Sequence, residues 1–250
     1  MRVTILGSGT NLHPRRAAAG YLVKTDNLFL MDFGPRTLSN LLKTSADRHQ
    51  IQYLLFTHYH ADHFSDFITF FFDAVCHSKF VSPRADLRII GPKGTKALFG
   101  TILRTFPSFN DSEFRVTLKE VSTRSFSIGS TRVTPVPVTH TDRQTCLGYR
   151  ITFQGRTLAY SGDATYAPNL IRLCRDVDLA ILDCSFPKNR PGEAHMHAGE
   201  CGRVAQEAGV KRLVLSHFYP IADRFDVKKH AAQVFRGKII RARDCMTLSV

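Results

Sequence analysis

The sequence lacks the features of membrane-spanning and disulfide-stabilised proteins. No apolar run reaches the length of a transmembrane helix, and residues 1–6 are typical of a strand, not of a charged region that precedes an apolar signal core. None of the six cysteines forms a Cys-x-x-Cys pair, and a chain of 250 residues does not need disulfides to fold. We therefore expect a soluble cytoplasmic protein with reduced, mostly buried thiols and no membrane partner.

Internal boundaries are also absent. No linker rich in proline, serine and glycine, no low-complexity tract and no short repeat divides the chain. A length of 250 residues is sufficient for one large α/β domain with a sizeable core. We expect a single domain over residues 1–250.

Acidic residues are scarce relative to basic ones. The chain has 21 Asp and Glu against 34 Lys and Arg, which gives a formal net charge of +13 and a pI near 9.8. Such a charge favours anionic substrates or nucleic acid as partners, although a solvated basic surface without a specific ligand explains it equally well. Short basic clusters such as residues 228–230 are too brief to identify a nucleic-acid site.

Potential metal ligands are concentrated in residues 57–63, which read Thr-His-Tyr-His-Ala-Asp-His. Imidazole nitrogens and carboxylate oxygens are donors that Zn²⁺, Fe and Mn accept. The apolar run at 51–56 is typical of a buried strand, and the aromatic-rich run at 64–72 indicates a helix. The histidines therefore lie on a strand-to-helix loop. The alternative is a His-rich surface loop with adventitious metal affinity.

Spacing within this loop suggests how the donors divide. In an extended loop, residues two apart project to the same side, so His58 and His60 can bind one metal together. Asp62 and His63 lie where the chain turns into the helix. Their side chains therefore point in a different direction from those of His58 and His60 and suit a second metal.

The string resembles the His-x-His-x-Asp-His signature of the metallo-β-lactamase superfamily. The resemblance covers nearly the whole chain and implies an α+β fold, a four-layer αββα sandwich in which two packed mixed β-sheets are flanked by helices. It also implies that three ligands lie outside the loop, each after a strand or a hairpin. One metal would be bound by His58, His60 and His140, the other by Asp62, His63 and His217, with Asp163 shared between them.

Apolar patterns and turn residues predict the other elements. Strands are expected at residues 20–24, 28–31, 87–90, 147–153, 157–160, 179–182, 210–215 and 238–242. Residues 114–121 and 125–139 are expected to form a β pair, with Gly129-Ser130 as the turn. Helices are expected at 95–103, 167–173, 198–208 and 227–235.

Several residues are candidates for supporting roles. Asp32 matches the superfamily's first acidic motif, which orients metal ligands from outside, although it also suits a cap for a helix at 35–42. His197, with His195 second, is the candidate general acid, because a pKa near neutrality suits proton transfer; a loop histidine without a role is an equal alternative for each. Arg143 either binds a substrate phosphate or faces solvent.

Details of the motifs look like the RNase Z and phosphodiesterase branch of the superfamily. The features that agree are the Asp62-His63 pair, Asp163 and the Ser216-His217 ending. The β-lactamases proper use a cysteine near the position of Asp163. The oxygen-reducing di-iron members carry a glutamate where this chain has His60. Both of these groups are disfavoured.

Such a centre predicts hydrolysis of an anionic ester. Two divalent ions carry four positive charges, which Asp62, Asp163 and a metal-bridging hydroxide reduce to about one. Two metals roughly 3.5–4 Å apart make hydroxide available near neutral pH and stabilise charge on a phosphoryl oxygen. As a ligand of this centre, Asp62 also counts as a catalytic residue. Zinc is the first candidate, with manganese or iron as alternatives.

The segment between His140 and Asp163 bears on the substrate. RNase Z enzymes carry a tRNA-binding arm there, but only 22 residues separate this pair, and a hairpin accounts for most of them. The chain also reads Leu-Asp-Cys-Ser at 182–185, where RNase Z enzymes have His-Glu-Ala-Thr. We therefore predict a phosphodiesterase that acts on a small anionic ester. The alternatives are an RNase Z-type or other nucleic-acid endonuclease, a lactone or thioester hydrolase, and a non-catalytic metal-binding sensor; a homodimer is suggested only by relatives.

Overall fold

Two mixed β-sheets of seven strands each form the centre of the structure, a computed structural model that describes residues 1–190 and 192–250. In spatial order, the first sheet contains β14 (Met246–Ser249), β1 (Arg2–Gly7), β2 (Gly20–Lys24), β3 (Leu28–Phe33), β4 (Tyr53–Leu55), β5 (Leu87–Gly91) and β6 (Val116–Glu120). The second contains β13 (Lys238–Arg241), β12 (Arg212–Ser216), β11 (Leu179–Asp183), β10 (Arg156–Tyr160), β9 (Cys146–Phe153), β8 (Thr131–Val138) and β7 (Phe126–Ile128).

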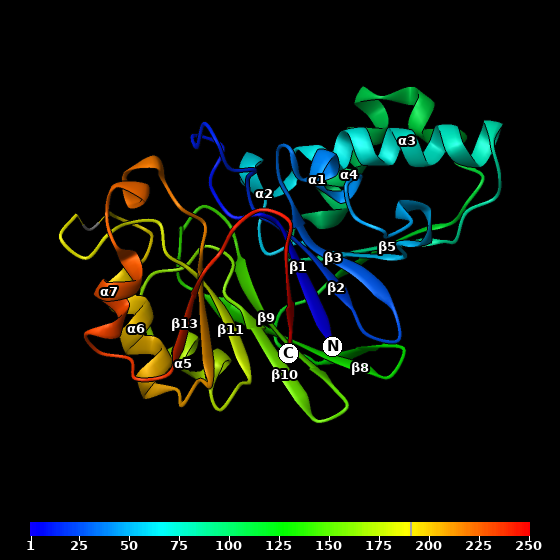
Figure 1. Ribbon diagram of the computed structural model, residues 1–250. Coiled ribbons are helices and arrows are strands. Elements are labelled where there is room, and N and C mark those ends of the chain that lie inside the picture. Colours follow the sequence, from blue (N-terminus) through cyan, green and yellow to red (C-terminus); the bar gives the residue numbers. More distant parts are fainter. Residues whose placement is uncertain (191) are drawn as a thin grey trace.

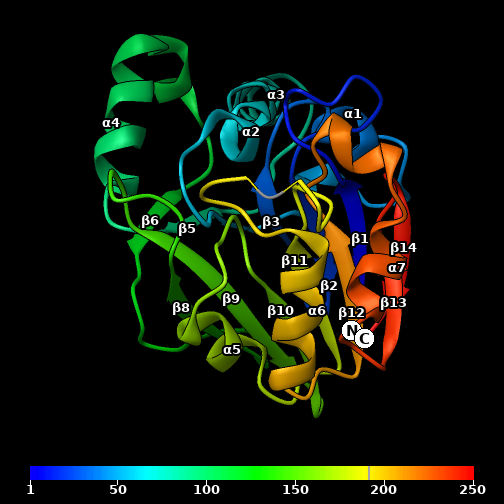
Figure 2. The same ribbon diagram turned by 90° about the vertical axis from the view of Figure 1, so that its left-hand side faces the viewer.

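Helices cover the outer faces of both sheets (Figures 1 and 2). Those associated with the first sheet are α1 (Thr37–Leu41), α2 (Ala61–Phe64), α3 (Asp66–Phe80) and α4 (Thr95–Thr105), and those on the second are α5 (Pro168–Cys174), α6 (Ala198–Glu207) and α7 (Val227–Ala232). Short 3₁₀ turns are η1 (Arg48–Gln50), η2 (Pro107–Asp111) and η3 (Pro220–Arg224). The predicted αββα sandwich is confirmed. Among the described residues, no helix combines the length and apolarity needed to cross a membrane.

Successive side chains on the strands of the first sheet are buried in two different cores, because both faces of this sheet are covered. On β3, Phe29 and Met31 belong to the core between the sheets, whereas Leu30 belongs to a second core beneath α3 and α4. This period of two is the pleat of a β-strand. The facing helix α3 shows the helical period instead, with buried side chains three or four positions apart at Phe67, Phe70, Phe71, Ala74, Val75 and Ser78.

Strand direction brings the carboxyl ends of many strands to one edge of the sandwich. Strands β3 to β6 run parallel in the first sheet, as do β10 to β13 in the second. Strand β8 shares the direction of β10, because each of them is antiparallel to β9. Ligands of α/β proteins bind outside such carboxyl ends. The predicted metal ligands follow β4, β8, β10 and β12, so this edge is where they meet.

The β pair predicted between residues 114–121 and 125–139 is wrong. Strand β6 instead pairs in parallel with β5, with Leu87 opposite Val116, and so belongs to the first sheet. Strands β7 and β8 form a hairpin in the second sheet, and Gly129 at its turn has a φ of 56°. Alternating apolar residues identify a strand but do not specify its partner.

We predict that truncation of the ring of Phe71 destabilises the fold far more than truncation of its neighbour. Phe71 is fully buried, and its ring packs 5.4 Å from that of Phe99 and 5.1 Å from that of Phe109. Phe71→Ala should lower the free energy of unfolding by about 3–5 kcal/mol, because it leaves a cavity. Phe72→Ala is the matched control, since Phe72 is 47% exposed. Urea denaturation of both variants measures this, and equal losses would contradict the assignment of α3's buried face.

Candidate metal centre

The structure brings the seven predicted metal ligands together in two groups. The loop that carries four of them follows β4, and the other three follow β8, β10 and β12. The ligand atoms of the first group, His58, His60, His140 and Asp163, lie within 4.8 Å of one another, and so do those of the second group, Asp62, His63 and His217. The two groups correspond to the two ligand sets that the resemblance implies, except that Asp163 is grouped only with the first. A further group with the same spacing consists of Asp163, Asp183, His195 and His217.

Separations between the ligand nitrogens have the size of a zinc site. His60 Nδ1 lies 3.2 Å from His140 Nε2, and His63 Nε2 lies 3.3 Å from His217 Nε2. Tetrahedral zinc with bonds of about 2.0–2.1 Å holds neighbouring nitrogens roughly 3.3–3.4 Å apart. Each nitrogen pair is therefore spaced as two ligands of one ion would be.

The Asp163 carboxylate lies between the two groups. Its Oδ2 is 3.7 Å from Nε2 of both His58 and His140, and its Oδ1 is 2.9 Å from Nε2 of His63 and 3.2 Å from Nε2 of His217. One carboxylate oxygen therefore faces each group. Two atoms, His58 Nε2 and Asp163 Oδ1, are buried without a hydrogen-bond partner among the described residues. Unsatisfied buried polar atoms are costly, and a bound cation would satisfy both. These residues fit divalent metal ions.

Hydrogen bonds at the outer ring nitrogens determine which nitrogen faces the centre. His63 donates Nδ1–H to Asp32 Oδ2 over 2.7 Å, and His140 donates Nδ1–H to the Ala194 carbonyl over 2.7 Å. In the neutral form of each ring, Nε2 is then the unprotonated nitrogen, and this is the form that binds metals. These two rings are thus held ready for a cation.

Asp32 organises the loop from behind. Its carboxylate accepts hydrogen bonds from Thr57 N (2.8 Å), Thr57 Oγ1 (2.8 Å) and Tyr160 OH (2.6 Å), in addition to the one from His63. Because the Thr57 hydroxyl donates to Asp32, it can accept from His58 Nδ1–H, which lies 3.0 Å away. Asp32 does not cap α1, so the alternative role considered for it is excluded.

His217 is held in a strained conformation by the glycine-rich turn after β1. Its φ of 61° lies in the left-handed region, which residues with a Cβ rarely adopt. The next residue, Phe218, donates its N–H to the Ser8 carbonyl (3.0 Å) and accepts from the Thr10 N–H (3.2 Å). His217 Nδ1 lies 3.1 Å from Ser185 Oγ, which leaves Nε2 facing the other ligands.

Electrostatic shifts at the centre favour an anionic carboxylate and bound positive charge. Burial raises the pKa of Asp163, but the charges of His217 and His63 outweigh it and hold this pKa well below its ordinary range. Burial likewise lowers the pKa of His63, yet the charges of Asp163 and Asp32 hold it well above its ordinary value. Burial, with the charge of His63, keeps the pKa of His58 well below its ordinary value, so His58 is neutral and can donate a lone pair.

A histidine and aspartate pair borders the ligands. His195 Nδ1 lies 2.8 Å from Asp183 Oδ2, and its ring centroid lies 4.9 Å from that of His140 and 5.4 Å from that of His217. Burial lowers the pKa of His195, but the Asp183 charge raises it above its ordinary value. Asp183 was not predicted as a site residue, although its position at the end of the apolar strand β11 was a usable signal.

His197 occupies a different place from the one predicted for a general acid. It is the N-cap of α6, where its Nδ1 accepts from Gly199 N (3.1 Å) and Glu200 N (3.2 Å), and Glu200 accepts from His197 N in return. This capping box satisfies backbone donors at the start of the helix. In the described part of the chain, His197 makes no hydrogen bond or ring contact with the seven ligands.

Arg143 lies beside the centre and not within it. It lines an open cavity of about 600 Å³ together with Tyr59, Lys93 and Gln144. Tyr59 belongs to the metal-ligand loop and donates its N–H to Gln144 Oε1 over 3.0 Å. The position next to this loop is compatible with contact to an anionic substrate.

Comparisons with known proteins agree with this geometry. Residues 28–218 match the family described as the β-lactamase superfamily domain. An uncharacterised protein of Mycobacterium tuberculosis is 32% identical over 248 residues, covering 96% of this chain and 88% of that protein. The probable metallo-hydrolase YhfI of Bacillus subtilis is 27% identical over 253 residues, covering 96% of each chain.

Solved structures show the same fold. The crystal structure of YhfI from Bacillus subtilis superposes with a TM-score of 0.85 at 26% identity, over 99% of this chain and 98% of that one. The short form of human tRNase Z has a TM-score of 0.80 at 22% identity, over 100% and 99% of the two chains. A diphosphatase of the PhnP family has a TM-score of 0.77 at 18% identity, over 100% and 97%.

We predict that Asp32→Asn weakens metal binding without unfolding the protein. The amide carries no charge and is a weaker acceptor for His63 Nδ1–H, so the ring loses the partner that fixes its orientation. Loss of such an outer partner typically costs about 10- to 100-fold in metal affinity. Competition with a chromophoric chelator measures zinc affinity, and the exposed Asp26→Asn is the control. Wild-type affinity in Asp32→Asn would show that the carboxylate does not support the site.

Proposed function

The chain belongs to the β-lactamase superfamily and is a metal-dependent hydrolase, and from that premise we propose that it is a phosphodiesterase acting on a small anionic ester. Two divalent cations, zinc first among them, would be held by the two ligand groups with Asp163 between them. We also propose that residues 1–250 act as one domain, because the ligands come from both sheets. The observation that carries the proposal is the His195–Asp183 pair at the border of the two ligand groups.

The pair supplies what the metal ligands do not, which is a proton for the leaving group. Asp183 accepts Nδ1–H of His195 and also accepts from Ser185 Oγ (2.6 Å) and Ala164 N (3.2 Å), so its position is fixed from three sides. A histidine oriented in this way can transfer its second ring proton to an oxygen within reach. Asp183 and Ser185 therefore affect the reaction indirectly, because they fix the orientation of His195.

The reaction that follows is hydrolysis of one ester bond of a phosphodiester. When bound, the two cations lower the pKa of water and offset the negative charge that grows on the phosphoryl oxygens. Water releases a proton to the solvent as its oxygen forms a bond to phosphorus, and the bond to the ester oxygen breaks. His195 gives its proton to that departing oxygen, and the products are a phosphomonoester and an alcohol. Asp163 and Asp62, as anions, would hold the cations throughout.

The chain between His140 and Asp163 supports a small substrate. Residues Cys146–Phe153 and Arg156–Tyr160 form strands β9 and β10 of the second sheet, so most of this segment is sheet. An arm that grips a long nucleic acid would need additional residues there. A nucleic-acid endonuclease remains the second candidate, because a net charge of +13 favours a polyanionic partner.

Metal-loaded protein should hydrolyse small phosphodiesters, and chelation should abolish that turnover. The assay compares bis(p-nitrophenyl) phosphate, a cyclic nucleotide and precursor tRNA as substrates. Treatment with EDTA removes activity, and added zinc or manganese restores it, because the ligands themselves remain intact. Efficient cleavage of tRNA with no turnover of either small diester would reverse the ranking of the two candidates. Turnover that survives complete chelation would refute the metal-dependent reaction.

Substitution of His195 should reduce activity in a way that depends on the leaving group. His195→Ala should lower kcat for an alkyl diester by about 10²–10⁴, because alkoxide departs poorly without a proton. The loss on bis(p-nitrophenyl) phosphate should be much smaller, since nitrophenolate is a stable anion. His197→Ser is the comparison, because serine also caps a helix. A larger loss from His197→Ser than from His195→Ala would assign the general acid to the other histidine.

A further inference from the structure

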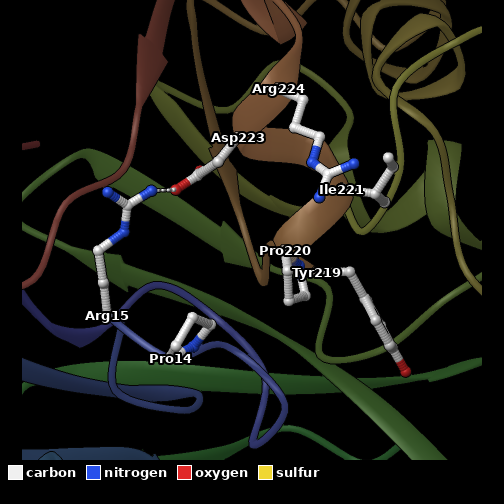
Figure 3. Close-up of a pocket in the computed structure, with 7 residues that line it drawn as sticks. All are labelled: Pro14, Arg15, Tyr219, Pro220, Ile221, Asp223 and Arg224. Carbon is white, nitrogen blue, oxygen red and sulfur yellow. Dashed lines mark ion pairs between the residues drawn. The ribbon is translucent and has the colours of Figure 1, made fainter.

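A cavity of about 550 Å³ adjoins the candidate metal centre and is not used by the chemistry proposed above. Pro14 and Arg15 contribute to it from the N-terminal loop, and Pro220, Ile221 and Arg224 contribute from η3 (Figure 3). Its volume is in the range of pockets that bind small molecules. Apolar carbon from the two prolines and the isoleucine provides a surface for a ring, and the two arginines provide charge.

Tyr219 connects this cavity to the reaction site. It lines the cavity, and its ring centroid lies 5.6 Å from that of His195 and 6.4 Å from that of His217. On another side, it stacks on Phe186 with the centroids 5.0 Å apart and the planes inclined by 19°. The cavity therefore lies on the His195 side of the centre, where the group that receives the proton would depart.

Positive charge in the cavity exceeds negative charge. The Asp223 carboxylate already pairs with Arg16 at 3.0 Å and Arg241 at 2.6 Å. Arg15 is 3.8 Å from the same carboxylate, but its side chain is 80% exposed, so this contact uses little of its hydrogen-bonding capacity. Arg224 is exposed and forms no ion pair with any residue that the structure describes. Two guanidinium groups therefore remain available to an anion.

We propose that this cavity binds the leaving group of the substrate and selects a planar ring that carries a second anionic group. The inference rests on the proposed phosphodiesterase function and adds a substrate class to it. A ring packs well on Tyr219 and on the proline faces, and guanidinium groups bind carboxylate or phosphate with directed hydrogen bonds. A neutral aliphatic leaving group would make no charge-assisted contact with Arg15 or Arg224.

A matched pair of substrates tests the charge requirement. Methyl 3-carboxy-4-nitrophenyl phosphate and its 3-carboxamide analogue have leaving groups of nearly the same size that differ by one charge, and both release a coloured phenol. We expect kcat/KM of the wild-type protein to favour the carboxylate by about three- to tenfold, the range of a partly exposed charge-assisted contact. Arg224→Gln combined with Arg15→Gln should reduce that ratio to about one. Arg104→Gln, an exposed substitution on α4, should preserve it.

The outcomes separate this inference from the function on which it rests. A wild-type preference that disappears in the double variant and persists in Arg104→Gln supports the leaving-group site. Equal kcat/KM values for the two esters in the wild-type protein, or a preference that survives the double substitution, would overturn it while leaving the phosphodiesterase function intact. If neither ester nor unsubstituted methyl 4-nitrophenyl phosphate is hydrolysed by metal-loaded protein, the proposed function itself fails.

Discussion

The buried carboxylate of Asp32 is the interaction on which the candidate metal centre depends, because it ties both sheets to the ligand loop. It accepts hydrogen bonds from Thr57 and His63 in the loop and from Tyr160 on β10 of the second sheet. Four such bonds use the acceptor sites of a carboxylate, so the charge is satisfied away from solvent. A shift of one sheet against the other would break at least one of these bonds. The sandwich and the site are therefore positioned by the same contacts.

Strained backbone conformations occur at residues that bind or orient the metal ligands. Asp32 and His217 both have positive φ angles, 53° and 61°, next to the ends of β3 and β12. Such conformations persist only when the surrounding structure determines them. For His217 the support comes from Phe218, whose backbone is held by the turn after β1 and whose ring lies 4.8 Å from the guanidinium of Arg16. Segments far apart in the sequence thus determine the orientation of one imidazole.

Local spacing predicted only part of this arrangement. The 57–63 loop could be assigned from residue types, because its donors are neighbours in the chain. His140, Asp163 and His217 were predicted only through the resemblance, since no local pattern shows which distant residues meet. The pairing of β6 and the short edge strand β14 were missed for the same reason: their partners are set by the tertiary structure. The sequence placed His197 ahead of His195 as general acid without a local signal for that order, because the cap of α6 and the position of Asp183 depend on how β11 and α6 pack.

The distribution of charge explains how a basic chain can build a cation site. Of only 21 acidic residues, four meet at this edge of the sandwich: Asp32, Asp62, Asp163 and Asp183. Their combined field attracts cations although the rest of the protein repels them. Burial lowers the pKa of His217, but Asp163, Asp183 and Asp62 raise it to about 10. Bound metal ions would cancel this local field. The net positive charge of the remaining surface would then act on the substrate. The protein therefore attracts cations to the metal centre and anions to the surface around it.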